Sequence, residues 1–342
     1  MISVKTSHIT MVPFDYSQAH YEIGVGLHNA TWPEVPDTVA DWRRRDEHRV
    51  KEHYYASYLI RNEDNQQFVG VGFIMHTTWT FHPQRFFIFV DVLPEYQGRG
   101  IGKQAYEFLM AELEPLEPLE LETESRADRP RSLRFLADRG FTIKTREYSS
   151  RLDLASFDPA GFGDYEGRMR EQGIEIIDLN ELKRREPDYL HIVYDLDVAL
   201  IHDVPWHHEK TPLAFEPWSE RFLSSEDRID ECYLLAVDGD QYVGLTMLFS
   251  NKAKDDTLYT GLTGVLPSHR RRGIAMALKL RALGYAKANF RTSDGAIPSV
   301  VTENEENNPM FTINERLGFK RQPDWLMYGC KLGDIEAGTR ED

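Results

Sequence analysis

The sequence contains few cysteines: only Cys232 and Cys330 occur in 342 residues. Two thiols cannot form a disulfide framework or a cysteine metal cluster, so disulfide-stapled scaffolds and cysteine-based metal sites are excluded. The chain also lacks any apolar run near the roughly 18 residues that a membrane-spanning helix requires. Its first residues, Met1–Thr6, lead into no such run, and we expect no signal peptide. These absences together favour a cytoplasmic location.

Positive charge is scarce as well. The chain has 40 Lys and Arg against 56 Asp and Glu, a formal net charge of -16. Because such a surface repels phosphate backbones and anionic lipids, we expect neither a nucleic acid nor a membrane as partner. A cationic substrate would be attracted, although many acidic proteins have no such substrate. The composition leaves the oligomeric state open.

The two halves of the chain repeat one another. Val92–Gly102 and Val265–Ala275 align without a gap at an offset of 173, and each begins Val-Leu-Pro. Three further matches keep the same order: His28 and Trp32 with His202 and Trp206, Phe68–Gly70 with Tyr242–Gly244, and Gly140-Phe141 with Gly318-Phe319. Four ordered matches at nearly constant spacing indicate a duplicated domain. We predict one domain over 1–155, a Gly/Pro/Asp-rich connector over 156–172 and a second domain over 173–342.

Each half has the pattern of a mixed α/β domain. In the first half, strands are predicted over Tyr54–Arg61, Val69–His76 and Arg85–Leu93, followed by an amphipathic helix over Gly100–Leu113. The equivalents in the second half are strands over Cys232–Val237, Val243–Phe249 and Leu258–Leu266, with a helix over Gly273–Asn289. Successive strands followed by βαβ elements predict a mostly antiparallel, twisted sheet flanked by helices, used twice.

A glycine-containing turn joins a strand to a helix in both halves. Its pattern is Gln97-x-x-Gly100-x-Gly102 in the first half and Arg270-x-x-Gly273-x-Ala275 in the second. Glycine permits the sharp turn and a close approach of ligand, and the first amides of the following helix lack internal partners. Together with the helix dipole they favour an anion such as a pyrophosphate. A tight turn without a ligand is the alternative, but the recurrence argues against it.

With these motifs the sequence resembles the GNAT acetyltransferase superfamily. The resemblance covers most of both halves, and the tandem arrangement is similar to that of mycothiol synthase. It implies an acyltransferase that uses acetyl-CoA as the acyl donor. It also implies cofactor-binding positions on each strand and turn: Val90, Asp91, Val92, Gln97, Gly98, Arg99, Gly100, Ile101, Gly102 and Lys103 in the first half, and Thr263, Gly264, Val265, Arg270, Arg271, Arg272, Gly273, Ile274, Ala275 and Met276 in the second.

The halves differ at two positions that the resemblance marks. An Asn eleven residues before the Gly of Gly-Phe contacts pantetheine in the family; this position is Asn307 in the second half and Arg129 in the first. Asn304, Asn307 and Asn314 are therefore candidate cofactor-binding residues, with helix or turn capping as the alternative role. Many members carry an acidic Tyr four residues before the same Gly, where this chain has Asn314 and Leu136. Asn307 and the three arginines favour the second half as the more complete active site.

No residue stands out as the acid or base. Glu303 ends a predicted strand that should lie near the acetyl group, and Tyr259 lies on the strand before the second turn, so we take these two as catalytic candidates. Glu122 and Glu124 occupy the similar region of the first half, and loss of the proton to water is the competing route. Trp32, Trp206 and His207 lie in aromatic stretches expected beside the acceptor, where they would contact a cationic amine. A metal site at these histidines lacks supporting ligands, and we expect none.

These observations predict an N-acetyltransferase that moves acetyl from acetyl-CoA directly to a primary amine of a cationic small molecule. Two alternatives stay open at this point. The chain could be a catalytically silent CoA-binding sensor or scaffold, or it could acetylate a lysine or an N-terminus of a protein.

Overall fold

The computed structural model describes residues 8–332. Met1–Thr6, on which the signal-peptide expectation rests, lie outside the described residues. The chain forms two compact units and passes between them four times along its length. Unit 1 comprises the residues up to Lys144, His208–Thr211 and the residues from Leu326 onward, and unit 2 comprises Thr145–His207 and Pro212–Trp325.

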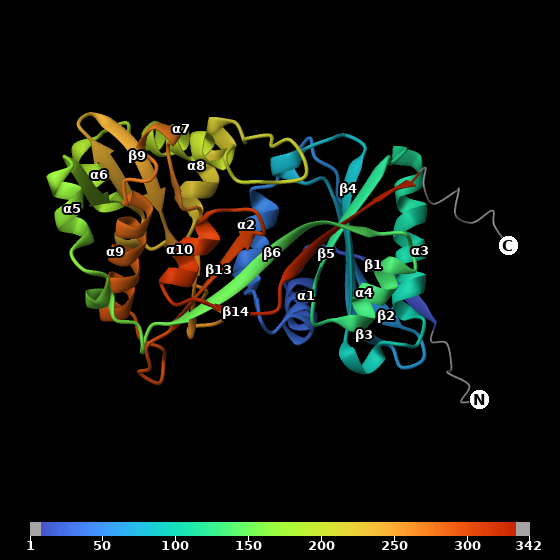
Figure 1. Ribbon diagram of the computed structural model, residues 1–342. Helices are drawn as coiled ribbons and strands as arrows, with labels where there is room; N and C mark the ends of the chain where they lie inside the picture. The colour runs from blue at the N-terminus through green and yellow to red at the C-terminus, as the bar shows by residue number, and fades with distance from the viewer. Residues whose placement is uncertain (1–7, 333–342) are drawn as a thin grey trace. The chain divides into compact units, whose positions relative to one another are not determined.

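Unit 1 is a sheet with helices on both faces (Figure 1). Its strands are β1 (Ile9–Pro13), β2 (Tyr55–Asn62), β3 (Gln67–Met75), β4 (Arg85–Val92), β5 (Glu120–Arg126), the start of β6 (Thr142–Asp153) and most of β15 (Trp325–Lys331). Its helices are α1 (Gln18–Thr31), α2 (Val39–Glu47), α3 (Ile101–Leu113) and α4 (Pro130–Ala137), with 3-10 turns at Thr78–Thr80, Pro94–Tyr96 and Glu114–Leu116. The strands run in the order β1-β2-β3-β4-β5-β15, antiparallel from β1 to β4 and parallel between β4 and β5.

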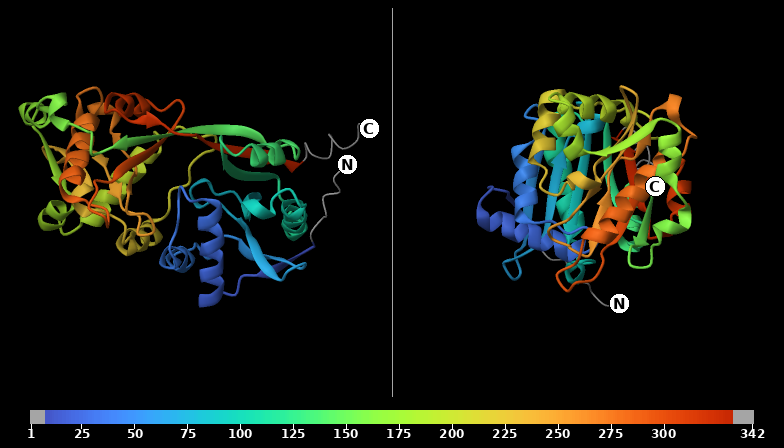
Figure 2. Two further views of the ribbon diagram at one scale, coloured as in Figure 1. Left: turned by 90° about the horizontal axis from the view of Figure 1, so that it is seen from below. Right: turned by 90° about the vertical axis from the view of Figure 1, so that its left-hand side faces the viewer.

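Strand alternation in β2 separates the two faces of this sheet. Leu59 packs with Phe14 and Tyr21 in the layer that α1 covers, whereas the next residue, Ile60, packs with Ile101 at the start of α3. Both β2 side chains are fully buried. Figure 2 shows α1 and α3 on different sides of the strands. The predicted strands of the first half are confirmed to within two residues at each end.

Helix α3 follows the glycine turn and buries one stripe of side chains. Its buried residues are Ile101, Ala105, Leu109 and Leu113, which recur every four positions. This spacing places them on one face of an α-helix. The other faces of α3 therefore lie away from the sheet, and this fact fixes which α3 residues can meet a ligand.

Unit 2 repeats the plan with a divided sheet. Its first sheet runs β12 (Gly264–Val265), β9 (Gln241–Thr246), β8 (Leu234–Asp238) and β7 (Ile174–Asp178), all antiparallel. Its second set runs β6, β13 (Ser299–Glu305), β11 (Thr257–Thr260) and β10 (Leu248–Phe249), with β14 (Lys320–Arg321) beside β6. The helices are α5 (Tyr165–Glu171), α6 (Leu179–Arg185), α7 (Tyr189–Ile201), α8 (Phe215–Ser224), α9 (Ile274–Asn289) and α10 (Met310–Arg316), with 3-10 turns at Pro159–Phe162, Asp230–Cys232 and Pro267–His269.

Two strands predicted as continuous in the second half are each divided, so those predictions were wrong in extent. The segment Leu258–Leu266 forms β11 and β12, and Val243–Phe249 forms β9 and β10. Gly261 stands at the first break, where a Cβ would lie 2.6 Å from the ring of Phe249 and 2.7 Å from Met247. Close packing at this bend turns the chain from one sheet to the other. The period-2 pattern continues across the break, which is why the sequence did not show it.

The last strand of each half belongs to the other unit. From Glu147 to Asp153, β6 pairs antiparallel with β13 of unit 2, and Leu152 and Leu154 are buried in the unit 2 core. In return, β15 lies next to β5 in unit 1, and Leu326, Tyr328 and Cys330 are buried in the unit 1 core. A local repeat cannot reveal such an exchange, because it concerns which segments pair over long sequence separations.

The predicted connector is part of unit 2 rather than a loop outside it. It contains a 3-10 turn and α5, and Phe157 and Met169 within it are buried in the unit 2 core. We retain the 1–155, 156–172 and 173–342 division as a proposal about where the repeat restarts. No helix in the described range 8–332 is both long and apolar enough to cross a bilayer.

Candidate active site

In unit 1 a cavity opens where two parallel strands separate. β4 and β5 pair over only three positions, Arg85–Phe87 with Glu120–Glu122, and then diverge while both continue. The space between them is a cavity of about 480 Å³. It is lined by Trp32, Ile88, Phe89, Val90, Asp91, Val92, Gln97, Gly98, Gly100, Gly102, Lys103, Tyr106, Thr123, Glu124, Ser125, Arg131, Ser132, Arg134, Phe135, Leu136, Asp138 and Arg139.

The glycine turn forms one wall of this cavity. Gly98 and Gly100 both have positive φ, 77° and 82°, which only glycine adopts without strain. Gly100 is the N-cap of α3 and offers no side chain to the first amides of the helix. The side chain of Gln97 turns back and donates to the Val92 carbonyl at 2.9 Å, which holds the turn against the end of β4. The sequence prediction of an anion-favouring turn thus falls on a cavity wall.

Basic side chains gather around the same cavity in an otherwise acidic chain. Lys103, Arg131, Arg134 and Arg139 all line it, together with three carboxylates, Asp91, Glu124 and Asp138. The guanidinium of Arg139 lies over the Phe135 ring at 3.5 Å and donates to the Phe135 carbonyl, so it is held in place. Burial lowers the pKa of Arg139, although a guanidinium keeps its charge at neutral pH. These groups favour an anionic ligand at this end of the cavity.

A buried carboxylate lies at the wall that faces α1. Asp91 is 3% exposed, and its Oδ1 accepts the indole N–H of Trp32 at 2.7 Å. Its Oδ2 has no hydrogen bond and lies 3.8 Å from Nδ1 of His28. Burial raises the pKa of Asp91, while the carboxylates of Asp91 and Asp37 outweigh burial at His28 and raise the pKa of that imidazole. The imidazole and the carboxylate therefore each favour the charged form of the other.

Two hydroxyls also face the cavity. Ser125 Oγ is buried without a hydrogen-bond partner. Tyr106 projects from α3 four residues after Gly102, and burial raises its pKa to about 12, so its phenol keeps its proton. Leu136, at the position where the resemblance places an acidic Tyr, is an apolar wall residue here. Tyr106 was absent from the sequence candidates, although its four-residue spacing from Gly102 could have indicated it.

Unit 2 contains a smaller version of the same opening. β11 and β13 pair in parallel over Thr257–Tyr259 and Ser299–Val301 and then diverge around a cavity of about 250 Å³. Two of the catalytic candidates, Tyr259 and Glu303, and two of the cofactor-binding candidates, Thr263 and Asn304, line it. Glu303 is exposed on β13 and Tyr259 is half-buried.

The three asparagines of unit 2 are bonded within the protein. Asn314 is fully buried and donates to Asn304 Oδ1 at 2.6 Å. Asn307 donates from its side chain and its backbone to the Glu305 carboxylate at 2.9 and 2.7 Å. These bonds give all three a structural role, so the contact with pantetheine that the resemblance implies stays a prediction.

The second glycine turn has the predicted shape, but its groups are already engaged. Gly273 is the N-cap of α9 with φ 86°. Arg270 binds Asp203 at 2.5 Å, and Arg272 binds Asp238 at 2.9 Å and Gln172 at 3.2 Å. Helix α5 lies beside α9 and puts Met169 and Tyr165 within 4 Å of a Cβ built on Gly273.

The positions from Gly264 to Met276 that the resemblance marks line neither of the two cavities described here. A glycine turn therefore lines a cavity in unit 1 but not in unit 2, whereas Asn307 and the arginines had favoured the second half. That preference could not foresee α5, because the covering helix lies a hundred residues earlier in the chain.

The aromatic candidates are distributed differently from what the repeat suggests. Trp32 is buried on the cavity wall of unit 1. Its counterpart in unit 2, Trp206, is half-buried, with its ring 4.9 Å from His207. His207 Nδ1 is 2.5 Å from the Thr145 hydroxyl. Only Trp32 of the three lines one of the two cavities.

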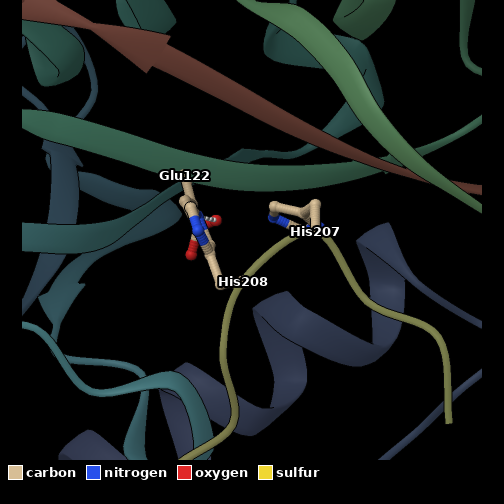
Figure 3. A group of neighbouring side chains, drawn as sticks. All are labelled: Glu122, His207 and His208. Atoms are coloured by element: carbon tan, nitrogen blue, oxygen red, sulfur yellow. Dashed lines mark ion pairs between the residues drawn. The ribbon is translucent and has the colours of Figure 1, made fainter.

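The next histidine, His208, lies in unit 1 against β5. Its Nε2 is 2.9 Å from Oε1 of Glu122, which is 3% exposed on its side chain, and 3.6 Å from Glu120 (Figure 3). Glu122 occupies the last paired position before β4 and β5 diverge. Of the two carboxylates expected in this region, Glu124 lines the cavity and Glu122 does not.

Comparison with known proteins agrees with this geometry. The family model "Acetyltransferase (GNAT) family" matches the chain twice, over residues 20–141 and 193–319. Comparison with curated protein sequences gives no match.

Solved structures with the same fold include a GCN5-related N-acetyltransferase from Sphaerobacter thermophilus, at 16% identity and a TM-score of 0.65, covering 94% of this chain and 95% of that one. A tandem GNAT protein from the clavulanic acid biosynthesis pathway is similar at 17% identity and a TM-score of 0.70, covering 95% and 98%. At these identities the likeness shows the fold. The two family matches, which together span well over half of the chain, show that it belongs to the acetyltransferase (GNAT) family as a tandem acyltransferase with two copies of the family's domain.

Proposed function

We propose that this protein is an acetyl-CoA-dependent N-acetyltransferase that binds its donor in unit 1 and acetylates a primary amine of a cationic small molecule. The observation that carries the proposal is the 480 Å³ cavity between the diverging strands β4 and β5, bounded by the glycine turn. Unit 2 has the same turn, but there α5 and the paired arginines occupy its surroundings. The two halves therefore have different roles in the proposal.

The residues present in unit 1 fit the donor. The uncapped amides of α3 and the side chains of Lys103, Arg131 and Arg139 would hold the phosphates. The apolar walls at Ile88 and Phe135 suit the pantetheine arm, and two buried oxygens with no hydrogen bond, Ser125 Oγ and Asp91 Oδ2, face the same space. Acetyl-CoA supplies an acetyl group activated as a thioester.

The edge of β4 can position and polarise a carbonyl. Its other edge pairs with β3 up to Val92, while pairing with β5 stops at Phe87. The backbone amides from Ile88 onward on the open edge are fixed by the sheet and face the cavity. Fixed amides stabilise negative charge that develops on an acyl oxygen, because they need no reorganisation during the reaction.

We propose Asp91 as the group that takes the proton from the attacking amine. An ammonium must lose a proton before it can attack, and Asp91 combines a raised pKa with an oxygen that has no hydrogen bond. The bond from Trp32 fixes the carboxylate, and His28 can accept the proton in turn. The Trp32 ring and the carboxylate together suit a cationic acceptor. Tyr106, which keeps its proton, can donate to the departing thiolate. Glu303 and Tyr259 remain candidates only if chemistry occurs in unit 2.

The test is release of free thiol from acetyl-CoA with a panel of polyamines, aminoglycosides and amino sugars, together with acetyl-CoA binding by calorimetry. We expect Asp91→Asn to lower kcat by about 10²- to 10⁴-fold, the usual contribution of a general base, with little change in acetyl-CoA affinity. The matched control is Asp197→Asn in unit 2, because Asp197 also accepts a tryptophan indole, that of Trp218 at 3.3 Å, and burial also raises its pKa. This control should leave kcat unchanged.

Other outcomes point elsewhere. Binding of acetyl-CoA without turnover on any amine or peptide would favour a CoA-binding sensor or scaffold. Turnover on lysine peptides or protein N-termini alone would favour protein acetylation. Absence of binding would contradict the proposal as a whole. The cytoplasm remains our predicted location.

A further inference from the structure

A buried lysine faces the cavity of unit 2. Lys279 of α9 is 3% exposed, and it lines the 250 Å³ cavity between β11 and β13. It occupies the repeat position of Tyr106, so both units direct the same α-helical position into the strand opening. A lysine there is unusual, because lysine is almost never fully buried unless it is paired.

No counter-charge accompanies this lysine. Among residues 8–332 no ion pair or hydrogen bond involves Nζ, which lies 6.0 Å from the centre of the Phe319 ring. Burial alone lowers the pKa of Lys279 to about 7. An uncompensated amine of this kind is costly to keep charged, and an anion beside Nζ would offset that cost.

Other polar groups that line the cavity are hydrogen-bonded to one another, so Lys279 is the group that would bind an anion. Thr263 shares a hydrogen bond with Thr246, Asn304 accepts from Asn314, and Glu305 accepts from Asn307. The remaining titratable groups that line the cavity are Glu147 on β6, Glu303 on β13 and Tyr259 on β11. None of them lowers or raises the pKa of Lys279, for which burial is the only cause.

The size and walls of the cavity limit the ligand. A volume of about 250 Å³ is roughly half that of the cavity in unit 1. Ile201, Val204, Leu262 and Met310 supply apolar wall. Near the second glycine turn, which would have to hold a pyrophosphate, Met169 and Tyr165 of α5 lie within 4 Å of a Cβ built on Gly273.

We propose that unit 2 binds a small organic monocarboxylate in this cavity, with its carboxylate on Nζ of Lys279 and its short apolar tail against Ile201, Val204, Leu262 and Met310. The site is separate from the donor cavity of unit 1 and does not depend on the function proposed there. Binding stabilises the protonated lysine, so the complex takes up a proton whenever the free amine is neutral.

The experiment compares three probes of one shape on the full chain by calorimetry: isovalerate, isovaleramide and isopentylamine. We expect isovalerate to bind at least tenfold more tightly than the neutral amide or the amine. Its affinity should fall toward tenfold per pH unit above pH 7, because one proton is taken up. Repeating the titration in two buffers of different ionisation enthalpy measures this proton directly. The comparison of probes needs no variant and so does not depend on mutant folding.

A variant pair locates the site. Lys279→Met should weaken isovalerate at least tenfold and remove the proton uptake. Lys320→Met, which removes an exposed lysine on β14, should leave both unchanged. Equal affinity for the acid and the amide, or unchanged binding by Lys279→Met, would overturn the proposal. So would absence of binding for butanoate, isovalerate and hexanoate up to about 10 mM. Borohydride trapping of isovaleraldehyde on Lys279 without acid binding would instead identify a Schiff-base lysine.

Discussion

The glycine at the second position of α3 offers a test in which function and stability should change in opposite directions. A Cβ built on Gly102 meets only Phe135 at 3.8 Å and Val92 at 4.0 Å, both ordinary contacts with residues that line the donor cavity. Gly102→Ala should therefore fit, and it should stabilise the helix by about 0.5–1 kcal/mol. For a domain of this size that raises Tm by about 1–3 °C.

The same methyl group stands where the phosphates would approach the first amides of α3. Loss of one hydrogen bond to a charged group costs about 1.5–3 kcal/mol, and 1.4 kcal/mol corresponds to a factor of ten. We therefore expect Gly102→Ala to raise KM for acetyl-CoA by about ten- to a hundredfold, with a smaller effect on kcat. The second half naturally carries Ala275 at this repeat position, next to a turn that α5 covers.

Thiol-release kinetics and differential scanning fluorimetry measure the two effects on one preparation. The control is Gly26→Ala, an exposed position in α1 where a Cβ meets nothing within 4 Å. It should give the same rise in Tm without any change in KM. A stabilised Gly102→Ala enzyme with unchanged KM would refute the assignment of the donor to this turn, since misfolding could not account for the result.

Three further predictions concern packing, strand exchange and charge. Gly70→Ala should destabilise the protein by about 3 kcal/mol in urea unfolding, because its Cβ would lie 2.1 Å from the Asp91 carbonyl oxygen; Gly72→Ala, which meets the flexible end of Met11 at 3.2 Å, should cost much less. Leu326→Ala should lower the unfolding free energy by about 3 kcal/mol and speed amide hydrogen exchange in β5 of unit 1. Leu152→Ala should have the same effects in β13 of unit 2. If each variant instead sped hydrogen exchange in its own half of the sequence, the strand swap between the two units would be contradicted. Burial lowers the pKa of Lys279 from 10.5 to about 7, so between these pH values the unfolded state binds more protons than the folded state. The unfolding free energy of the wild type should therefore rise with pH across this window, by up to about 1.4 kcal/mol per pH unit relative to Lys279→Met. Parallel curves of unfolding free energy against pH for the two proteins would count against the burial argument.

Local pattern was enough to find the duplicated architecture and the two turns. Gly100 and Gly273 were expected at strand-to-helix junctions, and both are left-handed N-caps there. The physical reason is that a sharp turn requires glycine at a fixed place, and a sequence records that requirement directly. The strands of the first half were predictable because short apolar runs rich in aromatic and β-branched residues are typical of strands buried on both faces.

The site residues that the sequence missed depend on which segments meet. Tyr106 and Lys279 share one repeat position, yet only the surrounding strands make it a cavity wall in each unit. Asp91 was selected for its backbone, whereas its buried side chain and the indole of Trp32, 59 residues earlier, form the more informative contact. Spacing along one element does not report contacts of this separation.

The sequence by itself determined that one fold is used twice, that each copy has a glycine turn suited to an anion, and that the chain resembles an acyltransferase. Only the tertiary structure decided that the copies are unequal. Helix α5 packs beside Gly273 in the turn of unit 2, α9 directs Lys279 into the smaller cavity, and the last strands of the two halves change places. These differences arise from packing between segments up to a hundred or more residues apart, where burial and close contact rather than local propensity select the arrangement.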